Sequence, residues 1–307
     1  MALSFSACGK TDTSDSTSKT ETSKEGGSDI VFTVGDVEIT KSEFEAYLSS
    51  YTQAGYDIET AKEYAKTDIT NNAALIAVVN KQGGFTDEDD KEVESKKKDI
   101  VEYQGGEDGY KKFLSSLGVD DNFITRELLA QVAQEKLFGD EISDENVKEY
   151  YQNNYWRAKH ILLKTQDDDG NAYDDAKKAE IKAKAEKLLA QAQAGADFDE
   201  LIKENSEDPG SQTNPDGYYF TKSEMVTEFE DCVKSLGMNE FGMCESTYGY
   251  HIIQRLPLED ESKFEDVKTS IKQMLIHTMT DEKLPELMKE NGIEVVTDDE
   301  VYNSITE

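Results

Sequence analysis

The residue pattern changes twice along the chain, and these changes constrain the fold more than any other feature. Before residue 154 most of the chain has apolar residues at helical spacing, in stretches at 61–81, 87–103, 110–117, 121–138 and 143–153. From Trp156 onward, β-branched and aromatic runs predict strands at 157–164, 218–220 and 248–255, with helices between them. After Pro257 a last long helix is expected. The chain is therefore an α+β block with helical segments on both sides.

The ends of the helical part are expected to meet. Residues 30–39 predict a short hairpin, and Thr40 followed by Glu43 is a capping-box signature for the first helix. The 49 residues after Leu258 are too few for a core of their own. We expect them to pack back on the N-terminal helices. The sequence therefore predicts a division of the chain into four segments, at 1–29, 30–152, 153–258 and 259–307.

The charge of the chain excludes two classes of function. It has 33 Lys and Arg against 66 Asp and Glu, a formal net charge of −33. Nucleic-acid binders and polybasic membrane-surface proteins both depend on an excess of cations, which this chain lacks. No run approaches the roughly 20 apolar residues that would span a bilayer.

The first nine residues resemble the end of a bacterial lipoprotein signal. Ser6 and Ala7 precede Cys8, which would carry the lipid after cleavage, although Phe5 stands where such signals usually have Leu. Residues 9–29 are almost all Gly, Lys, Thr, Asp, Ser and Glu, the composition of a polar tether. The alternative is a chance cysteine in an ordinary disordered N-terminus.

Two histidines lie on the first and last strands of the α+β block. His160 shares a strand face with Ala158 and Leu162, and His251 shares one with Gly249 and Ile253. If the two strands are neighbours, one imidazole can donate a hydrogen bond and the other accept it. From spacing alone, a pair of satisfied core histidines is the favoured explanation of the pattern.

Four motifs in this block resemble a known family. In order they are WRAKHILL at 156–163, SEDPGS at 206–211, EMVTEFED at 224–231 and YGYHII at 248–253. Together they resemble the parvulin-type peptidyl-prolyl cis/trans isomerases, and the flanking layout resembles extracytoplasmic foldases of the PrsA and SurA type. The resemblance implies a β-α-α-β-α-β isomerase domain at 153–258. It would be inserted in a mainly helical chaperone domain built from 30–152 and 259–307.

The resemblance also implies roles for particular residues. His160 and His251 match the family's paired histidines, and Asp208 matches the group beside the substrate carbonyl. Tyr248 falls where the family has Ser, Thr or an aromatic residue near the histidines. The apolar wall that receives the proline ring corresponds to Phe220, Met225 and Phe229. Because rotation about an X-Pro bond breaks no bond, we expect no cofactor and no metal.

One loop departs from the family pattern. The family has a Gly-Gly-Asp-Leu-Gly run before the central strand, with its Leu in the proline pocket, whereas this chain has NPDGYY from Asn214 to Tyr219. Tyr218 or Tyr219 could replace the missing apolar contact. The loop also leaves open the alternative function, a non-catalytic holdase chaperone whose parvulin domain only binds client chains.

The expected function is a peptidyl-prolyl isomerase and foldase on the outer face of a bacterial cell membrane. Its expected partners are unfolded or partly folded exported polypeptides with X-Pro bonds, the membrane through a lipid on Cys8, and a second copy in a homodimer. Cys232 and Cys244 could form a disulfide or remain free thiols, and the sequence does not decide between them.

Overall fold

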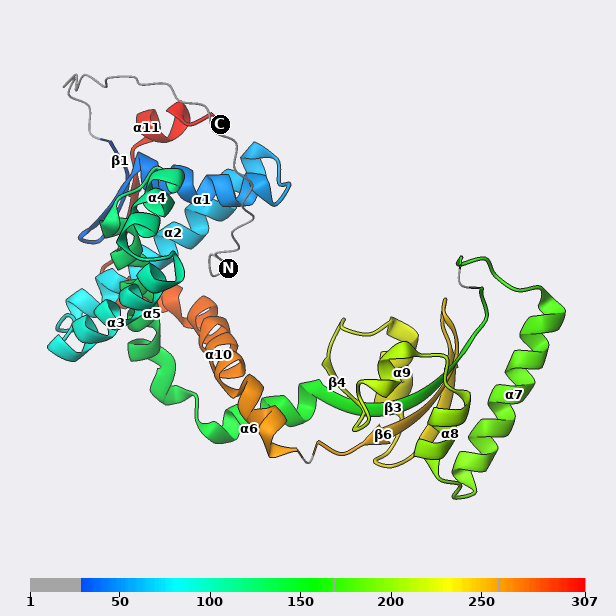
Figure 1. The fold of residues 1–307 in the computed structure, drawn as a ribbon. Helices are drawn as coiled ribbons and strands as arrows, with labels where there is room; N and C mark the ends of the chain where they lie inside the picture. The colour runs from blue at the N-terminus through cyan, green and yellow to red at the C-terminus, as the bar shows by residue number, and fades with distance from the viewer. Residues whose placement is uncertain (1–28, 168, 259, 307) are drawn as a thin grey trace. The chain divides into compact units, whose positions relative to one another are not determined.

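The computed structural model describes residues 29–167, 169–258 and 260–306, so Cys8 and the rest of the polar tether lie outside the described residues. The chain divides into two compact units. Unit 1 contains the residues up to Ile142 and those from Met274 onward, and unit 2 is Ser143–Gln273 (Figure 1). The helical part is thus interrupted by an α+β part, and the expected fold class is confirmed.

Unit 1 is mainly helical, with one small sheet. Its elements are β1 (Ile30–Val34), β2 (Val37–Thr40), α1 (Lys41–Gln53), α2 (Ile58–Lys81), α3 (Asp87–Tyr103), α4 (Glu107–Leu117), α5 (Asp121–Phe138), η1 (Gly139–Glu141), the second part of α10 (Glu261–Glu290), β7 (Val295–Thr297) and α11 (Asp299–Ser304). The antiparallel sheet has the order β2-β1-β7, so the last strand of the chain pairs with the first.

The start of α1 forms as its sequence predicts. The Thr40 hydroxyl accepts a hydrogen bond from the Glu43 backbone N–H, and the Glu43 carboxylate accepts one from the Thr40 N–H at 2.7 Å. This exchange satisfies two backbone donors that a helix otherwise leaves unpaired. Glu43 also forms an ion pair with Arg126 of α5, which links the cap to the helical core.

Unit 2 contains the second sheet. Its elements are α6 (Asp144–Asn154), β3 (Tyr155–Lys164), α7 (Asp175–Gln193), α8 (Phe198–Asn205), η2 (Pro209–Gln212), β4 (Tyr218–Thr221), α9 (Thr227–Ser235), β5 (Phe241–Glu245), β6 (Gly249–Leu256) and the first part of α10. The sheet is antiparallel throughout, with the order β4-β3-β6-β5. None of the helices in the described ranges is long and apolar enough to cross a bilayer.

Each face of this second sheet packs against its own set of helices (Figure 1). Ile161 and Leu163 of β3 join a buried cluster with residues of α7 and α8. Ala158 joins a second cluster on the other face, with Phe229 and Val233 of α9. His160 lies two residues after Ala158, on the same face of the strand. Alternation along β3 therefore directs His160 toward α9.

Two elements of unit 2 differ from the sequence prediction. Residues 241–245 form the additional strand β5, which had not been expected because Gly242 interrupts a run with little β-branched character. The pattern of residues 222–236 predicts one helix, but α9 begins only at Thr227. Ser223 has a φ of 70°, a left-handed conformation that a helix cannot contain, and residues 222–226 form a turn instead.

The pairing of β3 with β6 can be tested at Gly249. Its φ is +146°, and an added Cβ would lie 2.1 Å from the Leu163 carbonyl oxygen of the neighbouring strand. We expect Gly249→Ala to lower the free energy of unfolding by about 2–4 kcal/mol, measured by urea denaturation.

Gly195 is the matched control, because it too has a positive φ, +92°, but no atom within 4 Å of an added Cβ. Gly195→Ala should cost only about 1–2 kcal/mol. Equal losses of unfolding free energy in the two variants would show that glycine at 249 is not needed to avoid a clash with β3.

Candidate active site

The two histidines of the sequence pattern meet on one face of the sheet. In the β3–β6 register His160 lies opposite Ile253, and His251 lies opposite Leu162, so the two imidazoles are diagonal neighbours. Their Nδ1 atoms are 3.1 Å apart, and the rings are nearly parallel, at 11°. Both side chains are buried, at 8% and 4% exposure.

The loop before η2 brings Asp208 to this pair by hydrogen bonding to the edge of β3. β4 pairs with β3 only as far as Ala158. Beyond that point Leu162 donates its N–H to the Ser206 hydroxyl and accepts from the Glu207 N–H at 2.8 Å. The loop therefore takes the place of an edge strand, and the Asp208 carboxylate lies 2.8 Å from His160 Nε2.

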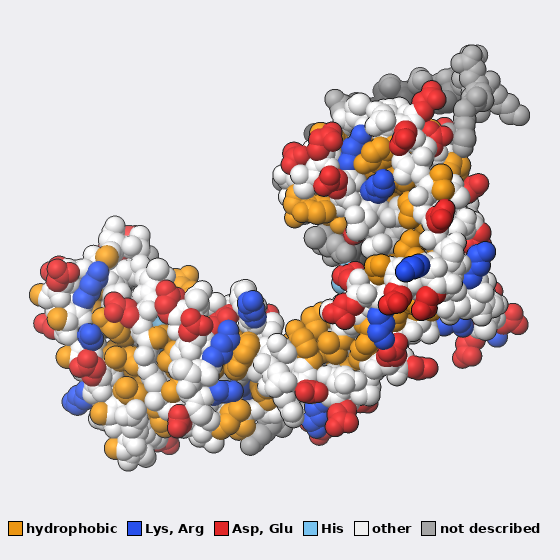
Figure 2. Space-filling model, turned by 180° about the vertical axis from the view of Figure 1, so that it is seen from behind, with side chains coloured by type: hydrophobic (Ala, Val, Ile, Leu, Met, Phe, Trp, Pro, Cys, Tyr) orange, Lys and Arg blue, Asp and Glu red, His pale blue; other side chains and the backbone are white. Residues whose placement is uncertain are grey.

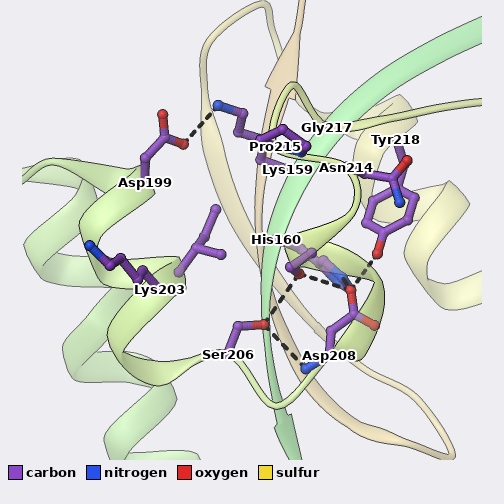
Figure 3. A pocket seen from close by; sticks show the side chains of 12 residues that line it. Lys159, His160, Asp199, Lys203, Ser206, Asp208, Asn214, Pro215, Gly217 and Tyr218 are labelled. Atoms are coloured by element: carbon purple, nitrogen blue, oxygen red, sulfur yellow. Dashed lines mark hydrogen bonds and ion pairs between the residues drawn. The ribbon is translucent and has the colours of Figure 1, made fainter.

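Asp208 is a partly buried carboxylate with three side-chain donors on one oxygen (Figure 3). Oδ2 contacts His160 Nε2, the Ser211 hydroxyl at 2.8 Å and the Tyr218 hydroxyl at 2.5 Å. Burial raises the pKa of Asp208, but the hydrogen bonds from His160, Tyr218 and Ser211 outweigh it and hold the pKa well below the usual range. The group is therefore ionised at neutral pH.

The hydrogen bonds form one continuous chain through the site. Burial, and then the neighbouring His160, lower the pKa of His251 to about 4, so this ring is neutral at pH 7. When the proton of His251 is on Nδ1, Ser246 donates to His251 Nε2 at 2.8 Å, His251 Nδ1–H donates to His160 Nδ1, and His160 Nε2–H donates to Asp208. Every polar atom of the two rings has a partner.

Apolar side chains border this chain in a cavity of about 560 Å³. Its lining includes Leu162, Met225, Val226, Phe229 and Tyr218, together with His160, Asp208 and His251. Phe229 meets the His160 ring edge-to-face at 5.2 Å. The cavity thus combines an apolar wall with a polar floor, as a site for a proline ring beside an amide requires.

Two of the residues named from the sequence differ in how they border the cavity. Phe220 is 1% exposed and packs behind Phe229, with ring centroids 5.8 Å apart, so it supports the wall without lining the cavity. Tyr248 borders the cavity but is 51% exposed, and the contact with His251 belongs to Ser246. Ser246 was missed because it follows β5, the strand that the sequence did not predict.

The departing loop places Tyr218 in the site. Gly217 has a φ of +93°, and a Cβ there would lie 2.8 Å from the Ala158 carbonyl oxygen, so no larger side chain fits at that position. The next residue, Tyr218, lies edge-to-face against His160 at 5.5 Å. Burial and the hydrogen bond to Asp208 raise the pKa of the phenol, which remains a donor.

Comparison with known proteins agrees with this geometry. A family model described as the PPIC-type PPIASE domain matches residues 145–256. Foldase protein PrsA 1 of Bacillus cereus is 31% identical over 277 residues, which cover 89% of this chain and 79% of that protein. The chain belongs to the PrsA foldase family.

Other members are similar over comparable lengths. Foldase protein PrsA of a Geobacillus species is 29% identical, covering 88% of this chain and 89% of that protein. A crystal structure of PrsA from Bacillus cereus aligns at a TM-score of 0.41 and 23% identity, covering 87% of this chain and 93% of that one. As a PrsA-type foldase, the chain carries a peptidyl-prolyl isomerase domain, and nothing in these comparisons favours the non-catalytic alternative.

The lowered pKa of His251 predicts a pH-dependent stability. A neutral buried histidine stabilises the fold fully above its unfolded pKa of 6.5, and this contribution is lost as the pH falls toward the folded pKa of about 4. Between pH 7 and pH 5 we expect the loss to be about 2 kcal/mol, measured by urea unfolding at each pH.

His251→Gln is the matched variant, since glutamine keeps a polar side chain but does not titrate. Its unfolding free energy should change less between pH 7 and pH 5 than that of the parent, by about the same 2 kcal/mol. Identical pH dependence in both proteins would contradict the assignment of this titration to His251.

Proposed function

We propose that the cavity of unit 2 binds an X-Pro segment of an exported polypeptide and that Asp208, His160 and His251 promote rotation about its amide bond. The observation that carries the proposal is the unbroken hydrogen-bond chain from Ser246 to Asp208 beside an apolar wall. The proline ring packs against Met225, Phe229 and Leu162, and the preceding carbonyl lies over Asp208.

The chemistry follows from what a planar amide loses on twisting. Resonance places negative charge on the carbonyl oxygen, and this charge decreases as the C–N bond rotates. A fixed carboxylate beside that oxygen repels the planar form more than the twisted one, which lowers the barrier. The role of the histidine chain is to keep Asp208 ionised and immobile, so His160 and His251 are positioning residues.

Tyr218 has two roles in this proposal. Its ring supplies the apolar contact at the place where the family has leucine, and its hydroxyl holds the Asp208 carboxylate. The loop from Asn214 to Tyr219 is in this view a different construction of the same pocket.

Unit 1 is proposed to hold client chains while unit 2 acts on them. Acidic side chains are scattered over the face of unit 1 seen in Figure 2, with hydrophobic side chains between them. Residues 29–142, the N-terminal part of unit 1, carry 25 Asp and Glu against 12 Lys and Arg. Such a surface stays soluble and attracts basic unfolded segments. A homodimer stays a prediction.

Isomerase activity tests the site directly. In a protease-coupled assay with an X-Pro peptide, Asp208→Ala in the full chain should lower kcat/KM by about 100-fold, because the fixed charge is lost. Tyr218→Phe keeps the ring and removes the hydroxyl, and we expect a loss of about 10-fold.

Tyr219→Phe is the matched control for Tyr218→Phe. Tyr219 is the next residue in the chain, and its ring packs on Arg157, whereas the Tyr218 hydroxyl bonds to Asp208. It should retain the parent rate. If Asp208→Ala kept full activity the mechanism would be wrong. If the parent itself had none while suppressing client aggregation, the holdase function would replace it.

Export and anchoring are the last part of the proposal. We expect Cys8 to carry a lipid, so that the Cys8→Ser variant appears in the medium or soluble fraction of the native host while the parent sediments with membranes. Mass spectrometry of the N-terminal peptide measures the lipid itself. Cys232→Ser is the control and should stay with the membrane; release of both variants, or of neither, would contradict the role of Cys8.

A further inference from the structure

Unit 2 contains two cysteines that the isomerase mechanism does not use. Cys232 lies on α9 and Cys244 on β5, and both are partly buried free thiols. Both pack against the same cluster, which includes Phe229 and Ile253. Helix and strand thus bring together side chains that the sequence separates by twelve positions.

The two thiols lie close enough to act on each other. Cys244 is the first cause of the lowered pKa of the Cys232 thiol, and Cys232 is the first cause of the raised pKa of the Cys244 thiol. A second observation agrees: a Cβ on Gly242 would lie 3.3 Å from Cys232 Sγ. Gly242 and Cys244 share one face of β5, because they are two residues apart. Cys232 therefore reaches across Gly242, whose missing side chain leaves it room.

We propose that Cys232 and Cys244 are a disulfide-forming pair that links α9 to β5 when the chain meets a small-molecule disulfide. Two thiols that already lie this close need only a small movement to reach bonding distance. Partial exposure of both residues gives a small oxidant access. The proposal concerns a covalent modification and does not depend on the isomerase mechanism.

The exchange proceeds in two balanced steps. The Cys232 thiolate, having given up its proton, attacks one sulfur of the small disulfide, forms a mixed disulfide and releases one small thiolate, which takes up that proton. Cys244 then loses its proton, attacks Cys232 Sγ and releases the second small thiol. Two protein S–H bonds are lost, one S–S bond is formed, and one small disulfide is reduced to two thiols.

The electrostatics of the pair favour this order. The neighbouring Cys244 lowers the pKa of the Cys232 thiol, whereas the neighbouring Cys232 and burial raise the pKa of Cys244. Since the thiolate is the nucleophile, Cys232 reacts first and Cys244 resolves the mixed disulfide.

The bond would join two parts of the pocket's support. Cys232 is one helical turn after Phe229, the wall residue that faces His160. Cys244 lies opposite His251 in the β5–β6 register. A covalent link between them restricts the unfolded chain and fixes α9 over the strand that neighbours β6.

The test uses the full chain with Cys8→Ser, which leaves Cys232 and Cys244 as its two cysteines. The reduced protein is incubated with excess oxidised glutathione, and its intact mass, maleimide-reactive thiols and thermal unfolding are measured. We expect the loss of two hydrogen atoms, no retained glutathione and no reactive thiol. The unfolding of unit 2 should shift upward by roughly 5–10 °C, reversibly with dithiothreitol.

Adding Cys232→Ser or Cys244→Ser gives the matched controls. Each leaves one thiol, which should retain one glutathione and give no such shift in unfolding temperature. The proposal is overturned if the parent keeps two reactive thiols, carries a glutathione on each, or forms only intermolecular links. A bond that forms without raising the unfolding temperature would overturn its stabilising role.

Discussion

The pairing of β3 with β6 is the constraint on which the rest of unit 2 depends. These strands open and close the α+β segment, so 91 residues separate His160 from His251. Their register sets Leu162 opposite His251 and His160 opposite Ile253. A slip by one residue would turn one imidazole to the opposite face, among the aliphatic residues that pack on α7 and α8. The close approach of Gly249 to Leu163 allows the strands to meet in this register.

A second constraint is the cost of holding a carboxylate in a partly apolar cavity. Burying a charge is unfavourable unless hydrogen bonds replace its water, and Asp208 has three side-chain donors on one oxygen. Gly210 takes part in this arrangement, because a Cβ there would lie 2.2 Å from the Tyr218 hydroxyl oxygen. Tyr218 can therefore reach Asp208 only because position 210 is glycine. The loop from Asn214 to Tyr219 and Gly210 therefore act together to hold the Asp208 carboxylate.

The sequence predicted those features that local patterns determine. The capping box at Thr40, the limits of the helices at 87–103 and 121–138, and the meeting of His160 with His251 follow from periodicity, caps and motifs. It did not predict β5, because a short strand containing Gly242 has little signal of its own and gains stability from pairing with β6. Ser246 was missed for the same reason. The contact of Tyr218 with Asp208 depends on the positive φ of Gly217 and on space at Gly210, which only the folded chain specifies.

Because unit 2 is inserted in the chain of unit 1, the two units become complete at different times during synthesis. Unit 2 is a continuous segment, and its core forms from residues within Ser143–Gln273. Unit 1 needs both ends of the chain: β7 pairs with β1, the Asp298 N–H donates to the Val31 carbonyl at 3.0 Å, and Tyr302 packs on Phe32 and Phe44. Contacts across more than 250 residues form only after a large loop has closed. During synthesis the isomerase unit is therefore complete first, and until β7 arrives the edge of β1 and the aromatic side chains beneath Tyr302 remain uncovered.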